Sequence, residues 1–176
     1  TAAPKRPAPI VGGARVKIAM VGAPLDYAAA KGNKDVTAAA ADLKRAVQLD
    51  AAFGPAHVEL GRALLLLGDA PGALDALRKG AQLMPSEAEA HSALAIALLA
   101  TGKRDEALAP MQRATEIDPG SAARRGNLGT VYMLLGRVDD AVKEYEVQVR
   151  LADRDPRAHG DLGGALLFKN DLVRAV

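Results

Sequence analysis

Apolar residues recur at helical spacing along most of the chain, in short runs separated by turn residues. Within residues 54–87 they form two runs: Leu60, Leu64 and Leu67, then Leu74, Leu77 and Leu83. Residues three or four apart share one face of an α-helix, so each run predicts an amphipathic helix. Gly68 lies between the runs, where glycine can adopt the left-handed conformation that ends a helix. The pattern therefore predicts two helices joined by a tight turn.

The same arrangement recurs with a period of 34 residues. Four series share this spacing, each defined by its own residue type: a Leu-Gly or Leu-Ala pair at Leu60, Leu94, Leu128 and Leu162; Gly68, Gly102 and Gly136, with Asn170 next; Ala73, Ala107, Ala141 and Ala175; and Pro85 and Pro119, with Asp153 in the following place. Independent series with one period indicate a repeat protein, whose units pack only on their neighbours.

This period, with these residue types, resembles the tetratricopeptide repeat family over about residues 35–176. In the unit 54–87 the resemblance is carried by His57, Leu60, Gly61, Leu64, Gly68, Ala73, Leu77, Gly80 and Pro85. It implies an all-α fold, a right-handed solenoid of helix-turn-helix repeats. The first helices of successive repeats then line a concave groove in which such proteins bind a partner.

The period also divides the chain. Residues 1–22 are predicted to form an extended, proline-rich and basic arm. Residues 23–53 are predicted to form a degenerate first repeat with a shortened first helix. Three complete repeats follow, at 54–87, 88–121 and 122–155. Residues 156–176 form a partial fifth repeat that stops early in its second helix. Solenoids normally need a polar cap, so we expect the intact protein to continue, or a partner or second copy to cover this end.

The composition excludes several classes of function and binding site. The chain is 49% hydrophobic but 3% aromatic, and 23 basic residues against 21 acidic ones give a net charge of +2. A nucleic-acid-binding protein would carry a clustered basic face, so we expect no nucleic-acid partner. The absence of Cys excludes disulfides and thiolate metal sites. The longest apolar run, Ala93 to Ala100, is too short to span a bilayer, which predicts no direct membrane insertion.

The three histidines fall at equivalent places of the repeat, at His57, His91 and His159, and Arg125 holds that place in the fourth unit. Equivalent helices of successive repeats lie about 10 Å apart, whereas a metal ion needs ligands within about 2.1 Å. We therefore predict a packing role for these rings and no metal site. A pH-sensitive packing role is the alternative, because histidine titrates near neutrality.

Catalysis finds little support in the sequence. No Cys is present, the serines stand in no triad relation to a histidine, and the glycine pairs Gly12-Gly13 and Gly163-Gly164 lack a phosphate-loop pattern. We expect no catalytic residues and no cofactor.

The resemblance also implies which side chains face the groove. Carried over by position, the candidate binding residues are Val58, Glu59, Arg62, Leu65, Leu66, Ser92, Ile96, Leu99, Asn127, Thr130, Met133, Leu134, Arg157 and Asp161. Glu89, Leu167 and Phe168 stand at equivalent places.

Chaperone-binding members of the family hold a terminal carboxylate in a clamp of Lys, Arg and Asn. Asn127 and Arg157 match two of its places, but Asp161 stands where Arg is wanted and would repel a carboxylate. A largely apolar groove that holds an apolar helix or an extended peptide is predicted instead. Alternatively the chain's own arm fills the groove, through Val16, Ile18 and Met20.

The repeat pattern and the predicted groove suggest three alternative functions. The first is a scaffold or adaptor that binds another protein or peptide, within a bacterial assembly of the pilus or secretion type. The second is a regulatory or substrate-docking region of a larger enzyme. The third is self-assembly by end-to-end stacking through the uncapped C-terminal repeat. Localisation stays open between the bacterial cytoplasm and a periplasmic, outer-membrane-tethered site.

Overall fold

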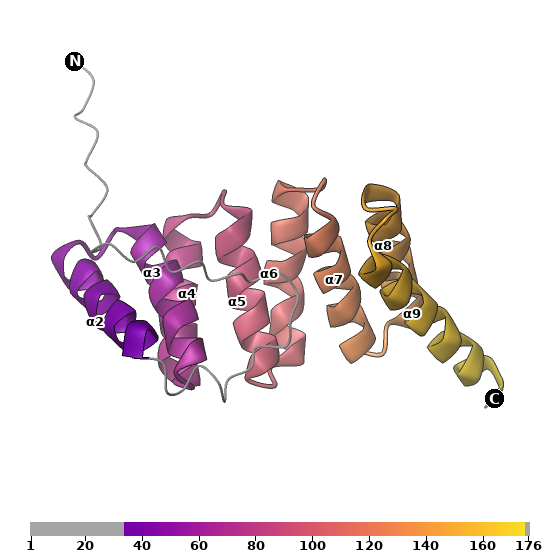
Figure 1. Ribbon diagram of the computed structural model, residues 1–176, viewed down its shortest axis with the longest axis horizontal. Coiled ribbons are helices and arrows are strands. Elements are labelled where there is room, and N and C mark those ends of the chain that lie inside the picture. Colours follow the sequence, from indigo (N-terminus) through magenta and orange to yellow (C-terminus); the bar gives the residue numbers. More distant parts are fainter. Residues whose placement is uncertain (1–33, 175–176) are drawn as a thin grey trace, which may run out of the picture.

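The computed structural model describes residues 34–174, and within this range it contains eight helices and no strand. In chain order the helices are α2 (Lys34–Leu49), α3 (Gly54–Leu66), α4 (Ala70–Leu83), α5 (Ala88–Ala100), α6 (Arg104–Ile117), α7 (Ala122–Leu134), α8 (Val138–Leu151) and α9 (Pro156–Arg174). Each helix packs against its neighbours in sequence, so together they form a single row (Figure 1). The predicted all-α solenoid of helix-turn-helix repeats is confirmed.

Pairs of helices occupy the three predicted complete repeats, with α3 and α4, α5 and α6, and α7 and α8 each falling within one 34-residue unit. We number positions 1–34 within each repeat from residues 54, 88, 122 and 156. Counting back by one period makes α2 a second helix of the predicted repeat 23–53. The predicted arm, with Val16, Ile18 and Met20, and the beginning of that first repeat lie outside the described residues.

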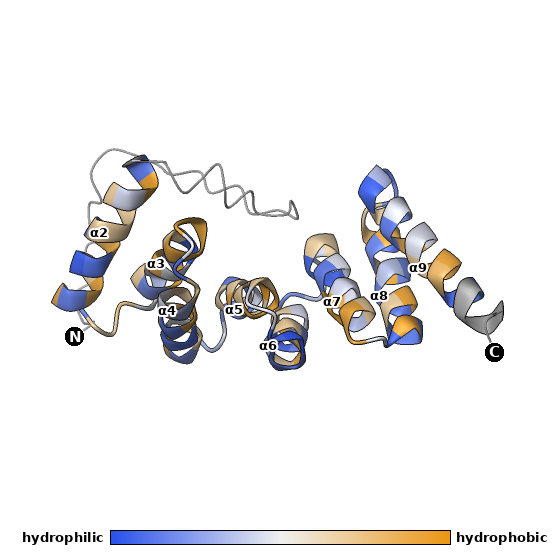
Figure 2. Cartoon of the chain, turned by 90° about the horizontal axis from the view of Figure 1, so that it is seen from below, coloured by the Kyte–Doolittle hydropathy of each residue, from blue (hydrophilic) through white to orange (hydrophobic). Residues whose placement is uncertain are grey.

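The row of helices is curved. Figure 2 shows α3, α5 and α7 toward the hollow side of the curve and α4 and α6 toward the outer side, with α2 and α9 at the two ends. The first helices of the repeats therefore line the inner face, as the family resemblance predicts.

Glycines end the first helices of the three complete repeats. Gly68, Gly102 and Gly136 have φ angles of +80°, +76° and +72°, in the left-handed region that side chains disfavour. The residue after each glycine donates a backbone hydrogen bond to a carbonyl five residues earlier; that from Asp69 to Leu64 measures 2.9 Å. This is the Schellman closure predicted from the glycine series.

Close packing inside each repeat depends on one pair of positions, 8 on the first helix and 24 on the second. A Cβ atom on Gly61 would overlap the Cγ atom of Leu77 and lie 3.0 Å from the carbonyl oxygen of Ala73. A Cβ atom on Gly129 would lie 2.6 Å from the ring of Tyr145. Leu77 and Tyr145 are both buried. A large side chain from the second helix thus fills the space left by a small residue on the first.

The fifth repeat departs from the prediction. Helix α9 runs to Arg174 and does not turn at Asn170, so the expected start of a second helix is absent from the described residues. Asn170 stands where the complete repeats have glycine with positive φ. An asparagine adopts that conformation less readily than glycine, and here the helix continues through it.

Gly61→Val should lower the free energy of unfolding by about 1–3 kcal/mol, because the added carbons overpack the contact with Leu77. Urea unfolding followed by circular dichroism measures the change. Gly164→Val is the matched control, since no atom of the described residues lies within 4 Å of a Cβ there, and its stability should stay within about 0.5 kcal/mol of the wild type. Equal losses in the two variants would contradict the packing role of position 8.

Candidate functional site

Three of the predicted groove residues, Val58, Leu65 and Ser92, are buried and cannot contact a ligand directly. Val58 and Ser92 stand at position 5 of their repeats. That position packs inward against position 27 of the second helix: a Cβ atom on Gly80 would lie 2.6 Å from Val58 Cγ2, and one on Gly126 would lie 2.6 Å from the Gln148 amide. Leu65 belongs to the hydrophobic core between the helices. For these three residues the prediction of a groove-facing side chain is wrong.

The remaining apolar candidates form a row along the last turn of the first helices. Leu66, Leu99, Met133 and Leu134 come from α3, α5 and α7 and are partly or fully exposed. Leu167 and Phe168 of α9 hold the same positions, 12 and 13, and are exposed. We call these six residues the apolar row. Ile96 of α5 lies one turn before Leu99 and is half-buried.

Charged residues form a second feature, a chain of ion pairs that we call the charged ladder. Its members are Glu59 and Arg62 of α3, Glu89 of α5, Arg124 of α7 and Asp118, which follows α6. Arg62 of α3 donates to Glu59, at 2.9 Å, and to Glu89 of α5. The other Glu89 oxygen accepts from Arg124 of α7, at 3.1 Å. Arg124 in turn donates to Asp118, at 2.6 Å. The ladder therefore joins three successive repeats.

The arginines of the charged ladder are more buried than their partners. The side chains of Arg62 and Arg124 are 11% and 18% exposed, whereas that of Glu89 is 51% exposed. The Nε atoms of both arginines are buried without an acceptor. The guanidinium groups consequently depend on the carboxylates at their Nη atoms, and Glu89 is the residue that both share.

The sequence predicted a largely apolar groove, and the charged ladder adds paired charges to the helices expected to line it. Glu59 and Arg62 were foreseen as groove residues, and their spacing of three residues permits the pair within α3. Arg124 and Asp118 were missed, because the positions carried over from the family did not include theirs. No local signal in the sequence couples Arg62 to a residue 27 positions away.

The polar candidates at the other end of the face are also paired. Thr130 donates to the carbonyl of Gly126, at 3.0 Å, and lies 3.2 Å from the hydroxyl of Tyr145. Burial raises the pKa of Tyr145, and this hydrogen bond partly offsets the effect. Asp161 accepts from the Gln148 amide at 3.2 Å and lies 3.8 Å from Arg157 Nε. Of the predicted residues here, Asn127 is half-buried and Arg157 is exposed.

The histidines each close the turn that precedes their own helix. The Nε2 atoms of His57, His91 and His159 lie 3.0, 3.1 and 2.8 Å from the carbonyl oxygen six residues earlier. Arg125 makes the equivalent bond to Pro119 O at 3.4 Å. A carbonyl only accepts hydrogen bonds, so Nε2 carries a hydrogen in each case. Both the neutral and the protonated ring can donate it, which argues against a pH switch at this contact.

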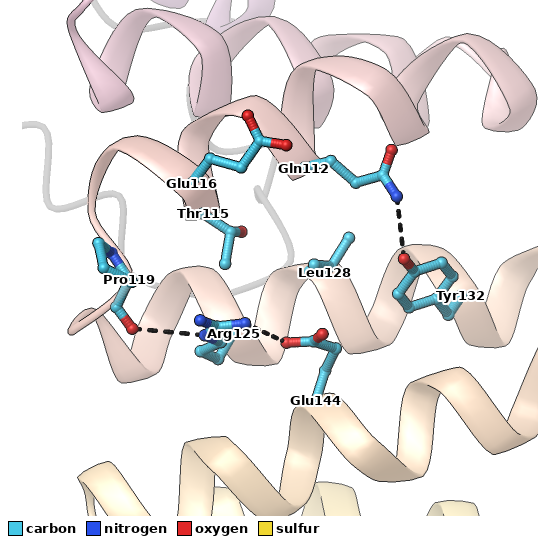
Figure 3. Close-up of a pocket in the computed structure, with 8 residues that line it drawn as sticks. All are labelled: Gln112, Thr115, Glu116, Pro119, Arg125, Leu128, Tyr132 and Glu144. Carbon is cyan, nitrogen blue, oxygen red and sulfur yellow. Dashed lines mark hydrogen bonds and ion pairs between the residues drawn. The ribbon is translucent and has the colours of Figure 1, made fainter.

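A hollow of about 240 Å³ lies between α6, α7 and α8, away from the residues predicted for the groove. Figure 3 shows two pairs of its polar lining side chains bonded to each other: Gln112 donates to the Tyr132 hydroxyl at 3.0 Å, and Arg125 to Glu144 at 2.9 Å. Thr115 is likewise bonded, to Met111 O. The guanidinium of Arg137 lies 4.6 Å from the centre of the Tyr132 ring. Of these contacts, the hydrogen bond between Gln112 and Tyr132 joins repeat 88–121 to repeat 122–155.

No three His, Cys, Asp or Glu side chains between residues 34 and 174 are arranged to hold a metal ion. In the same part of the chain, no helix has both the length and the apolar character needed to cross a membrane.

Sequence profiles of the tetratricopeptide repeat match the chain at residues 54–79, 73–122 and 98–167. Together the matches extend from the first complete repeat into α9. The chain belongs to the tetratricopeptide repeat family, whose repeats are typically interaction modules and not enzymes. No curated protein sequence matches it.

Solved structures of the family have the same fold. The crystal structure of MamA is similar with a TM-score of 0.72 and 26% identity, over 77% of this chain and 80% of that one. YrrB, described as a TPR protein with an unusual peptide-binding site, has a TM-score of 0.68 and 19% identity, over 77% and 70% of the two chains. The first TPR of Spaghetti (RPAP3), bound to an HSP90 peptide, has a TM-score of 0.63 and 19% identity, over 66% and 93%.

Glu89→Ala should lower the free energy of unfolding by about 1–2 kcal/mol, because two largely buried guanidinium groups lose a shared acceptor. Glu116→Ala is the control: Glu116 is 64% exposed and pairs with exposed Arg113, so its removal should cost less than about 0.5 kcal/mol. Urea unfolding at low and high salt measures both. A loss for Glu89→Ala no larger than the control's would count against a structural role for the charged ladder.

Proposed function

We propose that this protein is an interaction scaffold that binds a segment of another protein along its inner face, against the apolar row. The observation that carries the proposal is the arrangement of that face. Leu, Met and Phe side chains at positions 12 and 13 of four successive first helices are exposed or half-buried, and the charged ladder joins the first three of these helices. Large apolar patches on a protein surface often mark interaction sites.

The length of the apolar row indicates how many residues a ligand would need to cover it. Successive first helices lie about 10 Å apart, so the row from α3 to α9 is on the order of 30 Å long. An extended peptide rises about 3.3 Å per residue and would need about nine residues to span it. A helix, at about 1.5 Å per residue, would need about 20. Either form would place apolar side chains on the row and its polar side toward the charged ladder.

The charges of the inner face favour an apolar ligand over a terminal carboxylate. Arg62 and Arg124 are each held by two carboxylates, and Arg157 lies beside Asp161. A carboxylate ligand would have to displace these partners. Peptide binding by YrrB and by the first TPR of Spaghetti supports binding of a peptide by this fold, although neither relative is similar enough in sequence to indicate the ligand. A role within a bacterial assembly of the pilus or secretion type stays a prediction.

Leu134→Glu should weaken peptide binding at least about tenfold, because it places a charge in the middle of the apolar row. Dodecamer peptides selected from a random display library against the wild-type chain provide the ligands, and fluorescence polarisation gives their Kd. We expect the selected sequences to be rich in apolar residues. Leu66→Glu, on α3 at one end of the row, should weaken binding of the same peptides.

Ala109→Glu is the matched control, since Ala109 is exposed on the outer helix α6 and the charge added is the same. Its Kd should equal that of the wild type. Peptides that bind all three variants with equal affinity would refute the inner face as the binding site.

A further inference from the structure

The inner face carries two different features along its two sides. Among the first helices, the residues of the charged ladder stand at positions 2–9, whereas the apolar row stands at positions 12 and 13. A helix rises about 1.5 Å per residue, so the two features lie on the order of 10 Å apart. A peptide laid across the first helices would therefore have apolar side chains along one edge and charged groups along the other.

The side of the charged ladder that faces solvent is acidic. The carboxylates of Glu59, Glu89 and Asp118 are 43–51% exposed, whereas the guanidinium groups of Arg62 and Arg124 belong to side chains that are 11% and 18% exposed. The ladder also contains three carboxylates against two arginines. A peptide beside it meets carboxylate oxygens first, which favours a peptide with cationic side chains on that edge.

One segment of the chain's own sequence has the matching pattern. Arg15 and Lys17 alternate with Val16, Ile18 and Met20. We call residues 15–21 the alternating segment. Successive side chains of an extended peptide point to opposite sides. In that form the three apolar residues would share one edge, and the other edge would begin with the two cations.

The charge of the whole chain is divided in the same sense. Residues 1–22 contain four basic residues and no acidic one, and the net charge of the chain is +2, so residues 23–176 carry a net charge of −2. The alternating segment thus belongs to a cationic part of the sequence, and the repeats that present the inner face belong to an anionic part. Opposite charges of this kind attract the two parts to each other.

The connection between the two parts is long enough. Thirteen residues, 21–33, separate Met20 from Lys34 at the beginning of α2. Thirteen residues span about 40 Å when extended and about 20 Å as a helix. Helix α3 packs on α2 and α5 comes next among the first helices, at intervals of about 10 Å. Either length therefore brings Met20 within reach of the inner sides of α3 and α5.

We propose that the alternating segment occupies the inner face of its own chain, with Val16, Ile18 and Met20 on the apolar row and Arg15 and Lys17 beside the carboxylates of the charged ladder. A short linker holds such a segment at an effective concentration on the order of millimolar. A contact that is weak between separate molecules is then made in a large share of the molecules.

This inference rests on the proposed function, because it uses the same surface, and it adds regulation to that surface. A partner that binds the apolar row must displace the alternating segment. The apparent affinity for the partner is then reduced to the fraction of molecules in which the row is free. Partners with both apolar and basic residues compete best, because they replace both kinds of contact.

Pairs of introduced cysteines in the full chain test the placement, since the chain has no cysteine of its own. Ile18→Cys is combined with Leu66→Cys of α3 or with Leu99→Cys of α5, and a glutathione redox buffer gives the effective concentration of each pair. A disulfide requires Cα atoms within about 7 Å of each other. At least one of these pairs should form a disulfide within a single chain, with an effective concentration at least about tenfold above that of the controls.

Two controls differ from these pairs in one feature each. Ala19→Cys with the same partners moves the thiol to the opposite edge of the alternating segment. Ile18→Cys with Ala109→Cys keeps the segment unchanged and moves the second thiol to the exposed outer side of α6. Equal effective concentrations in the test pairs and the controls would overturn the proposal, as would disulfides that join two chains with none inside one chain.

Charge reversal tests the contact with the charged ladder. Arg15→Glu with Lys17→Glu, added to the better cysteine pair, should lower its effective concentration at least about threefold, because anions then face the carboxylates. Lys5→Glu with Arg6→Glu is the matched control, since it makes the same change of charge in the same arm ahead of the alternating segment. Equal effects of the two double substitutions would exclude the proposed pairing with the ladder.

The peptides selected from the display library separate this inference from the proposed function. A saturating peptide should lower the effective concentration of the Ile18→Cys pair by competing for the apolar row. A pair that forms its disulfide as expected but does not respond to peptide would refute the proposed function alone. Peptides that bind the wild type and are lost in Leu134→Glu, while the cysteine pairs equal their controls, would refute the present proposal alone.

Discussion

The architecture depends on a large side chain from the second helix of each repeat fitting against a small residue of the first. Leu77 over Gly61 and Tyr145 over Gly129 are two instances of one contact, between positions 24 and 8. The contact sets how closely the two helices approach, and protein interiors tolerate little error in volume at such a place. Positions 5 and 27 show that the rule concerns fit and not residue type. Val58 lies against Gly80, whereas Gly126 lies against Gln148, so the small residue changes helix and the close contact is kept.

This constraint explains why the fold could be predicted from the sequence and the inner face only in part. The contact joins residues 16 places apart within one unit, and it recurs every 34 residues, so it leaves a pattern along the chain. The turn glycines do the same, because the left-handed conformation selects glycine at each of them. The exception is Asn170, where the pattern predicted a turn and α9 continues. There asparagine stands in place of the glycine that favours the turn, and the spacing of the repeat alone could not show that the helix would continue.

The repeat pattern predicts the side chains of the inner face less well than it predicts the packing between helices. Position 5 was assigned to the groove by analogy, but in this chain it belongs to the packing between the two helices, which buries Val58 and Ser92. The charged ladder was not predicted from the sequence, for a different reason. Arg62, Glu89 and Arg124 meet across three repeats, and whether long side chains converge depends on the rotation of each helix, which periodicity does not fix. The apolar row was easier to foresee, since positions 12 and 13 recur at the ends of the first helices.

The same contact between positions 8 and 24 also explains how α9 differs from the other first helices. In a solenoid, stability is approximately a sum of terms for each repeat and for each interface between neighbours. Within the described residues, α9 gains the interface with the preceding repeat through its packing on α8, but no second helix of its own repeat lies against it. Leu166 is therefore 46% exposed, whereas Leu64, Leu98 and Tyr132 at the same position of the complete repeats are 3–7% exposed. The second helix of a repeat thus buries the first helix as well as itself, and positions 8 and 24 are where the two approach most closely.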